Sequence, residues 1–232
     1  MSAAHKRLSL IASLVPAGAK LCDVGTDHAL LPITLIKSGW IQSAIACDIA
    51  EGPLCVARKN LERWGIRGIE LRLSDGLVGI KPGEADVIVV AGLGGELTAE
   101  ILARCCWLKD SAITLILQPT TSADILRRWL CENGFLIETE PALLENGKLY
   151  SVIKARFTGE KADVNAAFYY AGKVDPRDRT GALYIGKQLT RCIRCAESLK
   201  PTPKQEEYRH YKELADGLAA LLEIEGNENN GI

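Results

Sequence analysis

The stretch Lys20–Pro32, KLCDVGTDHALLP, determines how the rest of the chain is interpreted. Leu21–Val24 predicts a short buried strand, Gly25 begins a tight turn, and the residues from Ala29 onward have the composition of a helix. A strand, a glycine-containing turn and a helix N-terminus bring free backbone N–H groups to the carboxyl end of the strand. Because nucleotide-like ligands bind at this place in open α/β sheets, the stretch predicts a ligand site.

Two acids within this turn restrict the kind of ligand. Asp23 and Asp27 would repel a pyrophosphate group, because like charges at short distance repel one another. They suit a cationic or hydroxyl-rich ligand instead. S-adenosylmethionine carries a sulfonium, an ammonium group and ribose hydroxyls, so we predict it as the cofactor. Either acid taken alone also fits the N-cap of the following helix.

The composition is that of an ordinary globular protein. The 232 residues are 47% apolar and 25% charged with a net charge of −1, so any surface for RNA has to be local. No apolar run reaches the length of a membrane span, and polar residues interrupt the apolar N-terminal segment. Eight cysteines lie mostly within apolar runs, as reduced core residues do in cytosolic proteins. We therefore expect a soluble cytoplasmic protein without a membrane segment.

Cys192 and Cys195 form the one spaced cysteine pair of the sequence. A zinc site needs further ligands, and the sequence offers no second cysteine pair and no histidine pair with suitable spacing. We therefore expect no metal, and we interpret the two cysteines as positions on one helix stripe.

Strands and helices alternate through the N-terminal part of the chain. Asp86–Ala91 reads DVIVVA and Ile113–Leu117 reads ITLIL, and such continuous apolar runs predict strands that are buried on both faces. The hydrophobic pattern predicts further strands at 41–47 and 69–73, and helices at 2–15, 30–38, 52–64, 96–105 and 122–131.

The alternation changes after residue 134. Phe135–Leu144 and Lys148–Phe157 are both strand-like, and they flank Asn146-Gly147. An Asn-Gly pair between apolar runs is typical of a β-hairpin, because both residues tolerate positive φ. A dinucleotide-binding fold would continue with parallel strands. A doubly wound, Rossmann-like α/β sheet that ends in an antiparallel hairpin is instead the architecture of class I S-adenosylmethionine-dependent methyltransferases.

The C-terminal segment predicts a helical hairpin. Apolar residues recur at coiled-coil-like intervals on both sides of Pro201 and Pro203. We expect a methyltransferase domain over 1–158 and a small α-helical domain over 159–232, with a tRNA contact in the latter. The expected seam consists of Ile185, Leu189, Cys192, Ala196, Leu199, Tyr211, Leu214, Leu218 and Leu221. The cations expected to contact RNA, or else to form a solvated helix face, are Lys173, Arg177, Arg179, Lys187, Arg191 and Arg194.

Two further acids follow the next two strands. Asp48 ends the second strand and is placed to accept hydrogen bonds from both ribose hydroxyls. Asp75 ends the third strand, before Gly76, and can accept from the adenine amino group. Each acid alone also fits a solvated strand end or a turn, but acids at three successive strand ends favour one shared pocket. The residues assigned to cofactor binding are Asp23, Gly25, Asp27, Asp48, Asp75, Gly76 and Gly92.

A glycine-rich turn, Ala91–Gly95, ends the fourth strand, where the transferred methyl group and its acceptor usually meet. Glycines let a substrate approach the backbone closely and leave N–H groups available, so Gly94 is a candidate catalytic residue. A simple helix-entry turn is the alternative, but it seldom needs three glycines. His28 lies beside the proposed methyl site and is a second candidate, although a lone histidine is often structural.

Four motifs in this order resemble the bacterial tRNA (adenine(22)-N(1))-methyltransferase family. They read DVGTDHALLP, AGLGGEL, LILQP and ENGKLY in this chain. The family reads approximately D-I-G-S-D-H-A-Y-L-P, A-G-M-G-G, L-I-L-Q-P-N and D-G-K-x-Y. The similarity extends from Leu8 to Phe157, and the helical tail agrees with the family's small C-terminal domain.

The resemblance implies methyl transfer from S-adenosylmethionine to N1 of an adenine, at position 22, in the D-arm region of tRNA. It points to Asp27 as the main catalytic acid. Thr120, a further candidate, stands where the family motif has Asn. A hydroxyl is shorter than an amide and carries one proton, so the contacts to the base differ there.

Three alternatives stay open on the sequence. A nicotinamide dehydrogenase is disfavoured by Asp27, by the absence of a G-x-G-x-x-G motif and by the terminal hairpin. A non-catalytic protein that binds tRNA and S-adenosylmethionine would keep the same pocket. A methyltransferase acting on another RNA base would keep it as well.

Overall fold

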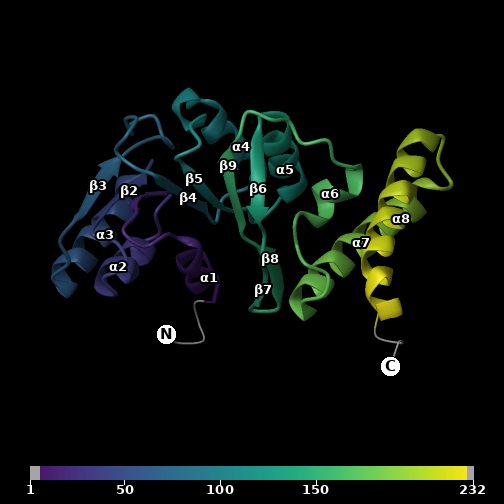
Figure 1. The fold of residues 1–232 in the computed structure, drawn as a ribbon, viewed down its shortest axis with the longest axis horizontal. Coiled ribbons are helices and arrows are strands. Elements are labelled where there is room, and N and C mark those ends of the chain that lie inside the picture. The colour runs from purple at the N-terminus through teal and green to yellow at the C-terminus, as the bar shows by residue number, and fades with distance from the viewer. Residues whose placement is uncertain (1–5, 229–232) are drawn as a thin grey trace. The chain divides into compact units, whose positions relative to one another are not determined.

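Seven strands form one sheet in the order β3-β2-β1-β4-β5-β9-β6 (Figure 1) in the computed structural model, which describes residues 6–228. Strands β1 to β5 are parallel, and β9 is antiparallel to β5. The order reverses between β1 and β4, so the sheet is doubly wound and the predicted fold class is confirmed. The strands are β1 Lys20–Val24, β2 Ser43–Asp48, β3 Ile69–Leu73, β4 Val87–Ala91, β5 Thr114–Gln118, β6 Phe135–Thr139 and β9 Ile153–Phe157.

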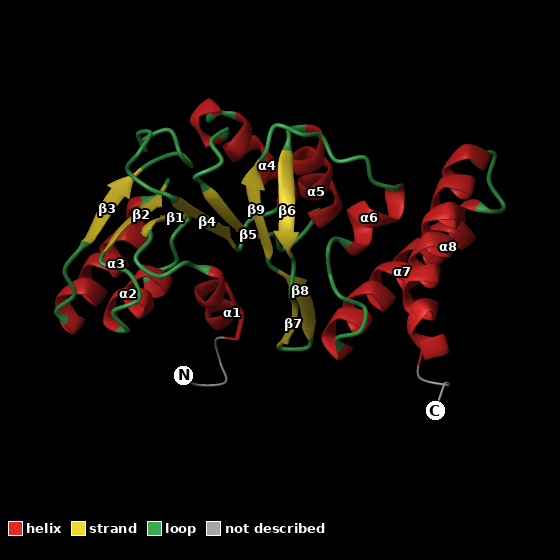
Figure 2. Cartoon of the chain, viewed as in Figure 1, coloured by secondary structure: helices red, strands yellow, loops and turns green. Residues whose placement is uncertain are grey.

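Helices connect most of these strands (Figure 2). Small residues let α2 and α3 pack closely on β2, since Ala29, Ile33, Ala46 and Ala57 form one buried cluster. The helix expected over 2–15 is observed from Lys6, and residues 2–5 lie outside the described part. The helices are α1 Lys6–Leu14, α2 Leu30–Lys37, α3 Glu51–Trp64, α4 Gly95–Ala103 and α5 Ala123–Glu132, with the short 3₁₀ helix η2 Cys106–Leu108.

Position in the sheet explains the hydrophobic pattern of each strand. The central runs Val87–Val90 and Leu115–Leu117 are at most 2% exposed, because other elements cover both faces. The edge strand β3 alternates instead, and its last residue Leu73 is 55% exposed. A continuous apolar run thus marks a central strand of the sheet, and alternation of apolar and polar residues marks the edge strand β3.

The terminal hairpin differs from the expected one. Instead of one long ladder there are four strands, since β6 and β9 join the main sheet while β7 Ala142–Glu145 and β8 Lys148–Ser151 form a separate pair. Asn146 and Gly147 have positive φ at the β7–β8 turn, as predicted. Pro141 interrupts the outgoing strand because proline has no N–H to donate to a ladder.

The chain divides into two compact units. The first extends through residue 138 and includes 152–162, and the second holds 139–151 and the chain from 163 onward. The division into functional domains after residue 158 stays a prediction.

In the second unit, α7 Arg179–Leu199 and α8 Gln205–Glu228 form the predicted helical hairpin, and α6 Ala166–Ala171 packs against both. A single buried cluster includes Tyr184 and Ile185 of α7 and Leu214 and Leu218 of α8. The short loop before α7 is anchored by Asp178, whose carboxylate accepts the N–H groups of Thr180 and Gly181 at 3.0 Å.

Leu218→Ala should destabilise the second unit by about 2–5 kcal/mol, because Leu218 is fully buried and its removal leaves a cavity between the helices. Leu183→Ala is the matched control, since Leu183 of α7 is 49% exposed and should change stability little. Urea denaturation followed by far-UV circular dichroism would measure both. Equal losses in the two variants would contradict the helical packing.

Candidate active site

The strand register brings the candidate residues to one edge of the sheet. Val24 of β1 is level with Cys47 of β2 and with Val90 of β4. Asp48 is level with Leu73 at the end of β3, and Ala91 is level with Gln118 at the end of β5. The turns after β1 to β5 therefore share the carboxyl edge. These turns contain Asp27, His28, Asp75, Gly76, Gly92, Gly94 and Thr120.

The turn after β1 is fixed by its backbone. The N–H groups of Gly25 and Thr26 both donate to Cys47 O, at 2.9 and 3.0 Å. Gly25 has φ of +68°, and a side chain there would also lie 3.7 Å from Leu93 in the turn after β4. His28 follows in the left-handed region with φ of 59°, which costs a non-glycine residue about 1–3 kcal/mol. The turn after β1 is thus strained at His28, and it lies beside the glycine-rich turn after β4.

Asp23 is the fourth residue of β1, and its side chain contacts this turn. Its carboxylate accepts the Thr26 hydroxyl at 2.5 Å, and the residue is 7% exposed. Burial raises the pKa of Asp23 to about 6, against the lowering effect of the Thr26 hydrogen bond and with a smaller contribution from the charge of Asp27. Asp23 therefore supports the turn from within and is a titrating group next to the expected cofactor.

Asp27 is placed quite differently. Its side chain is 85% exposed, and Oδ1 lies 3.3 Å from Nε2 of His28. The backbone of His28 is held from α3, because Asn60 Nδ2 donates to His28 O at 3.1 Å. The two candidate catalytic side chains thus stand together on the open side of the turn, where a carboxylate can meet a substrate.

The acids after β2 and β3 have different partners. Asp48 Oδ1 accepts the N–H of Ala50 at 2.8 Å, which leaves its second oxygen for a ligand as far as the described residues are concerned. Asp75 Oδ2 accepts from Arg104 Nη1 at 2.9 Å, a partner that the sequence did not indicate. The amino group of the cofactor's adenine would therefore share the Asp75 carboxylate with Arg104.

Glycine is needed at two positions of the glycine-rich turn for different reasons. Gly92 has φ of +84° with open space where a side chain would project, so a substrate can approach there. At Gly95 a Cβ would lie 2.1 Å from Ser122 O, so only glycine lets α4 begin this close to the turn before α5. Gly94 is less constrained, since its Cβ would lie 3.1 Å from Thr121 Oγ1.

Gln118 ties the turns after β4 and β5 together. The residue is 1% exposed, its Oε1 accepts the N–H of Gly92 at 3.2 Å, and its Nε2 donates to Pro119 O at 2.9 Å. Thr120 adds two contacts, because its N–H and its hydroxyl both donate to Leu93 O, at 2.8 and 3.1 Å. The proton of the Thr120 hydroxyl is therefore committed, and the side chain faces a substrate as an acceptor.

Three residues that the sequence analysis missed belong to this edge. Gln118 was detectable as the polar residue that ends an otherwise apolar strand. Ile49 is 69% exposed directly after Asp48, and an exposed isoleucine there offers an apolar surface to a nucleobase. Arg104 gave no signal, because its ion pair with Asp75 joins residues that are far apart in sequence.

The donor set fits S-adenosylmethionine. Carboxylate acceptors at the ends of β2 and β3 suit hydroxyl and amino groups, Asp27 suits a cation, and the space at Gly92 admits a ligand close to the backbone. Within residues 6–228 there is no cluster of three or more His, Cys, Asp or Glu side chains that could hold a metal ion. No helix in that same range is both long and apolar enough to span a membrane.

Known proteins share this sequence and this fold. The family described as Methyltransferase domain matches residues 4–153. The tRNA (adenine(22)-N(1))-methyltransferase of Bacillus subtilis is 33% identical over 228 residues, which cover 94% of this chain and 95% of that protein. This chain belongs to the tRNA (adenine(22)-N(1))-methyltransferase family.

Solved structures of relatives of this methyltransferase agree in fold. The crystal structure of the Bacillus subtilis M1A22 tRNA methyltransferase TrmK is 29% identical with a TM-score of 0.83, and the match covers 94% of this chain and 97% of that one. A Streptococcus pneumoniae protein in complex with S-adenosyl-L-methionine is 34% identical with a TM-score of 0.79, over 94% and 98% of the two chains. The resemblance drawn from four motifs is confirmed over nearly the whole chain.

The stability of this methyltransferase should depend on pH through Asp23. The pKa of Asp23 rises from 3.8 to about 6 on folding, so the folded state holds the proton more tightly. The stabilisation is present below pH 3.8 and is lost as pH rises through 6. The difference between parent and Asp23→Asn unfolding free energies should therefore shift by roughly 3 kcal/mol between pH 3.5 and 7.5, against the parent at higher pH. Urea denaturation of both proteins across this range measures it, and a constant difference would contradict the burial of Asp23.

Proposed function

We propose that this methyltransferase transfers the methyl group of S-adenosylmethionine to N1 of adenine 22 in tRNA, and that it does so in the cytoplasm. The observation that carries the proposal is the shared carboxyl edge, where Asp27, Asp48 and Asp75 lie at the ends of three neighbouring strands and the glycine-rich turn follows the next strand, in a member of this family. S-adenosylmethionine supplies an electrophilic methyl group when it is bound. The residues described above provide its hydroxyl and amino acceptors.

The task of the protein at N1 is chiefly one of positioning. Adenine N1 has a lone pair in the plane of the ring, so no strong base is needed to create the nucleophile. The base becomes cationic as N1 is methylated, and an exposed carboxylate beside it stabilises that charge. Asp27 fits this role because its side chain is exposed on the open side of the turn. The Thr120 hydroxyl oxygen can accept a hydrogen bond from the amino group of the target adenine.

N1 lies on the Watson–Crick edge, so the target adenine has to be unpaired or extruded from its helix. The two turns braced by Gln118 provide a rigid rim at which such a base can be held. A rigid rim favours the proposal over a role as a tRNA-binding protein without catalysis, which would need no preorganised acceptor position.

The direct test is incubation of the protein with tRNA and S-adenosylmethionine, followed by nuclease digestion and mass spectrometry of the nucleosides. We expect 1-methyladenosine, with the modification at position 22 when the tRNA is fragmented and sequenced. A methylated nucleoside other than 1-methyladenosine would support the alternative of another RNA base. Cofactor binding without any methyl transfer would support the non-catalytic alternative.

Asp27→Asn should lower kcat by about 10²-fold and lower cofactor affinity far less, because the change keeps the shape of the side chain and removes only its charge. Asp216→Asn is the control, since Asp216 is an exposed acid on α8. Steady-state kinetics and calorimetry measure the two effects. If Asp27→Asn matched the parent rate, Asp27 would not be the catalytic acid.

We also propose that α7 contacts the phosphates of tRNA. Lys187, Arg191 and Arg194 line one hollow of about 480 Å³ on this helix, together with Thr190 and Cys195. All three cations are exposed, and none of them forms an ion pair with a carboxylate among the residues described. Arg177 is less available, because it pairs with Asp175 at 3.0 Å.

Replacing Lys187, Arg191 and Arg194 together by alanine should weaken tRNA binding and flatten its salt dependence by about 2–3 in the slope of log K against log salt, because fewer counterions are released. The control is the double change Arg209→Ala and Lys212→Ala, which removes exposed cations from α8. Melting temperature and S-adenosylhomocysteine affinity should not change in either variant. Identical salt slopes in parent and triple variant would place the RNA surface elsewhere.

A further inference from the structure

The connection from β3 to β4 is the unusual one in this sheet. Helices follow β1, β2, β4 and β5, but residues 74–86 run from β3 to β4 in turns and bends alone. Two expected cofactor residues, Asp75 and Gly76, stand at the start of this loop. Without a helix packed on the sheet, the loop needs another anchor to hold them in place.

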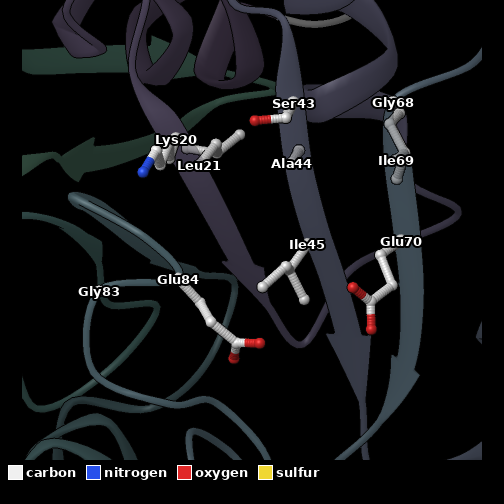
Figure 3. Close-up of a pocket in the computed structure, with 10 residues that line it drawn as sticks. All are labelled: Lys20, Leu21, Ser43, Ala44, Ile45, Gly68, Ile69, Glu70, Gly83 and Glu84. Carbon is white, nitrogen blue, oxygen red and sulfur yellow. The ribbon is translucent and has the colours of Figure 1, made fainter.

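Apolar packing supplies only part of that anchor, because Leu77, Ile80 and Ala85 of the loop are buried but the packing is incomplete beside Glu84. A hollow of about 550 Å³ lies between the loop and the amino-terminal part of β1, β2 and β3. Figure 3 shows Glu84 extending from the loop into this hollow, toward the side chains of Ile45 and Glu70 on the strands. Such a hollow forfeits the dispersion contacts that a packed helix would make.

Arg72 of β3 adds polar contacts on the side of the loop that faces the hollow. Its Nη1 donates to Glu84 Oε2 at 2.7 Å and its Nη2 to Glu84 Oε1 at 3.2 Å, a two-pronged pair. Nη2 and Nε also donate to Glu70 Oε1, at 2.6 and 2.9 Å. Nη1 further donates to Gly79 O at 2.8 Å, so one guanidinium holds the loop at two points. The hydrogen bond from Arg72, with a second from the Lys81 N–H, lowers the pKa of Glu84 to about 2.

From Gly79 the hydrogen bonds continue to the cofactor edge. Gly79 N–H donates to Ser74 Oγ at 2.9 Å, and that hydroxyl donates to Gly76 O at 3.0 Å. Ser74 N–H donates to Asp48 O at 2.9 Å, and Ser74 is 7% exposed. The loop approaches Ser74 so closely that a Cβ on Gly79 would lie 2.9 Å from Ser74 Oγ. One buried serine thus connects the clamped loop to the turns that carry Asp48 and Asp75.

We propose that Arg72 is a positioning residue for cofactor binding, which acts through Glu84, Gly79 and Ser74 to set the turns of Asp48 and Asp75. Arg72 does not touch the cofactor in this account. The inference rests on the proposed function, in which those two acids hold the nucleoside of S-adenosylmethionine. The contacts of Arg72 with Glu84 and Gly79 would then affect the affinity for that nucleoside and not the methyl-transfer step.

The test compares Arg72→Met with Arg156→Met. Arg156 forms an ion pair of similar length, 2.6 Å to Glu138, and its strand β9 is separated from β1, β2 and β3 by β4 and β5. Calorimetry with S-adenosylhomocysteine should show about tenfold weaker binding for Arg72→Met and no change for Arg156→Met. The kcat at saturating S-adenosylmethionine should stay within about twofold of the parent, because the turns after β1 and β4, where the adenine that accepts the methyl group is expected, are unchanged.

Two further variants guard against misfolding and test the geometry. Glu84→Gln keeps the shape and removes one charge, so it should weaken S-adenosylhomocysteine binding in the same direction by about threefold. Arg72→Lys keeps the charge but loses the two-pronged contact, and it should recover part of the affinity lost in Arg72→Met. Hydrogen exchange should show faster exchange at residues 78–84 in Arg72→Met.

The outcomes separate this inference from the proposed function. If Asp48→Ala weakens S-adenosylhomocysteine binding and Arg72→Met does not, the cofactor site stands and the positioning role is overturned. Faster exchange in the loop with unchanged affinity would overturn it as well, because Arg72 would then hold the loop alone. If Asp48→Ala leaves the affinity unchanged, the proposed cofactor site itself is wrong.

Discussion

Parallel pairing of β1 with β2 on one side and β4 on the other is the constraint on which the site depends. It makes Val24 level with both Cys47 and Val90, so the chain leaves three neighbouring strands at one edge. The order reverses between β1 and β4, and the connections therefore diverge there. The turn with Asp27 and the glycine-rich turn lie on either side of that point, and a Cβ at Gly25 would lie 3.7 Å from the Leu93 side chain.

Close backbone approaches and buried polar side chains brace this edge. Gly95 permits α4 to begin against Ser122 O, and the buried amide of Gln118 bridges the same two turns. On the other half of the edge, Ser74 joins the ends of β2 and β3. Different residues brace the glycine-rich turn and the turns of Asp48 and Asp75, so substitutions can test their contributions to catalysis and to cofactor affinity one at a time.

Much of this was predictable from the sequence, because the deciding signals are local. Apolar runs identified the central strands, and the acids at strand ends were expected at one edge because parallel strands end together. The split of the terminal hairpin was missed, because the prediction relied on Asn146-Gly147 and did not take Pro141 into account. Arg104 and the clamp at Arg72 could not be predicted, because each joins residues brought together only by the crossover between strands. For Gln118, the sequence showed a polar residue at the end of an apolar strand, but it did not indicate the two groups to which its amide is hydrogen-bonded.

A crystal structure of this protein with S-adenosylhomocysteine would show whether the nucleoside binds at the carboxyl edge of the sheet. We expect the ribose hydroxyls on the Asp48 carboxylate, the adenine between Ile49 and the Asp75 turn, and the sulfur facing the glycine-rich turn near Gly92. Ligand density in the hollow beneath the loop of residues 74–86, at the amino-terminal part of the strands, would contradict this placement, as would a ribose that makes no contact with Asp48.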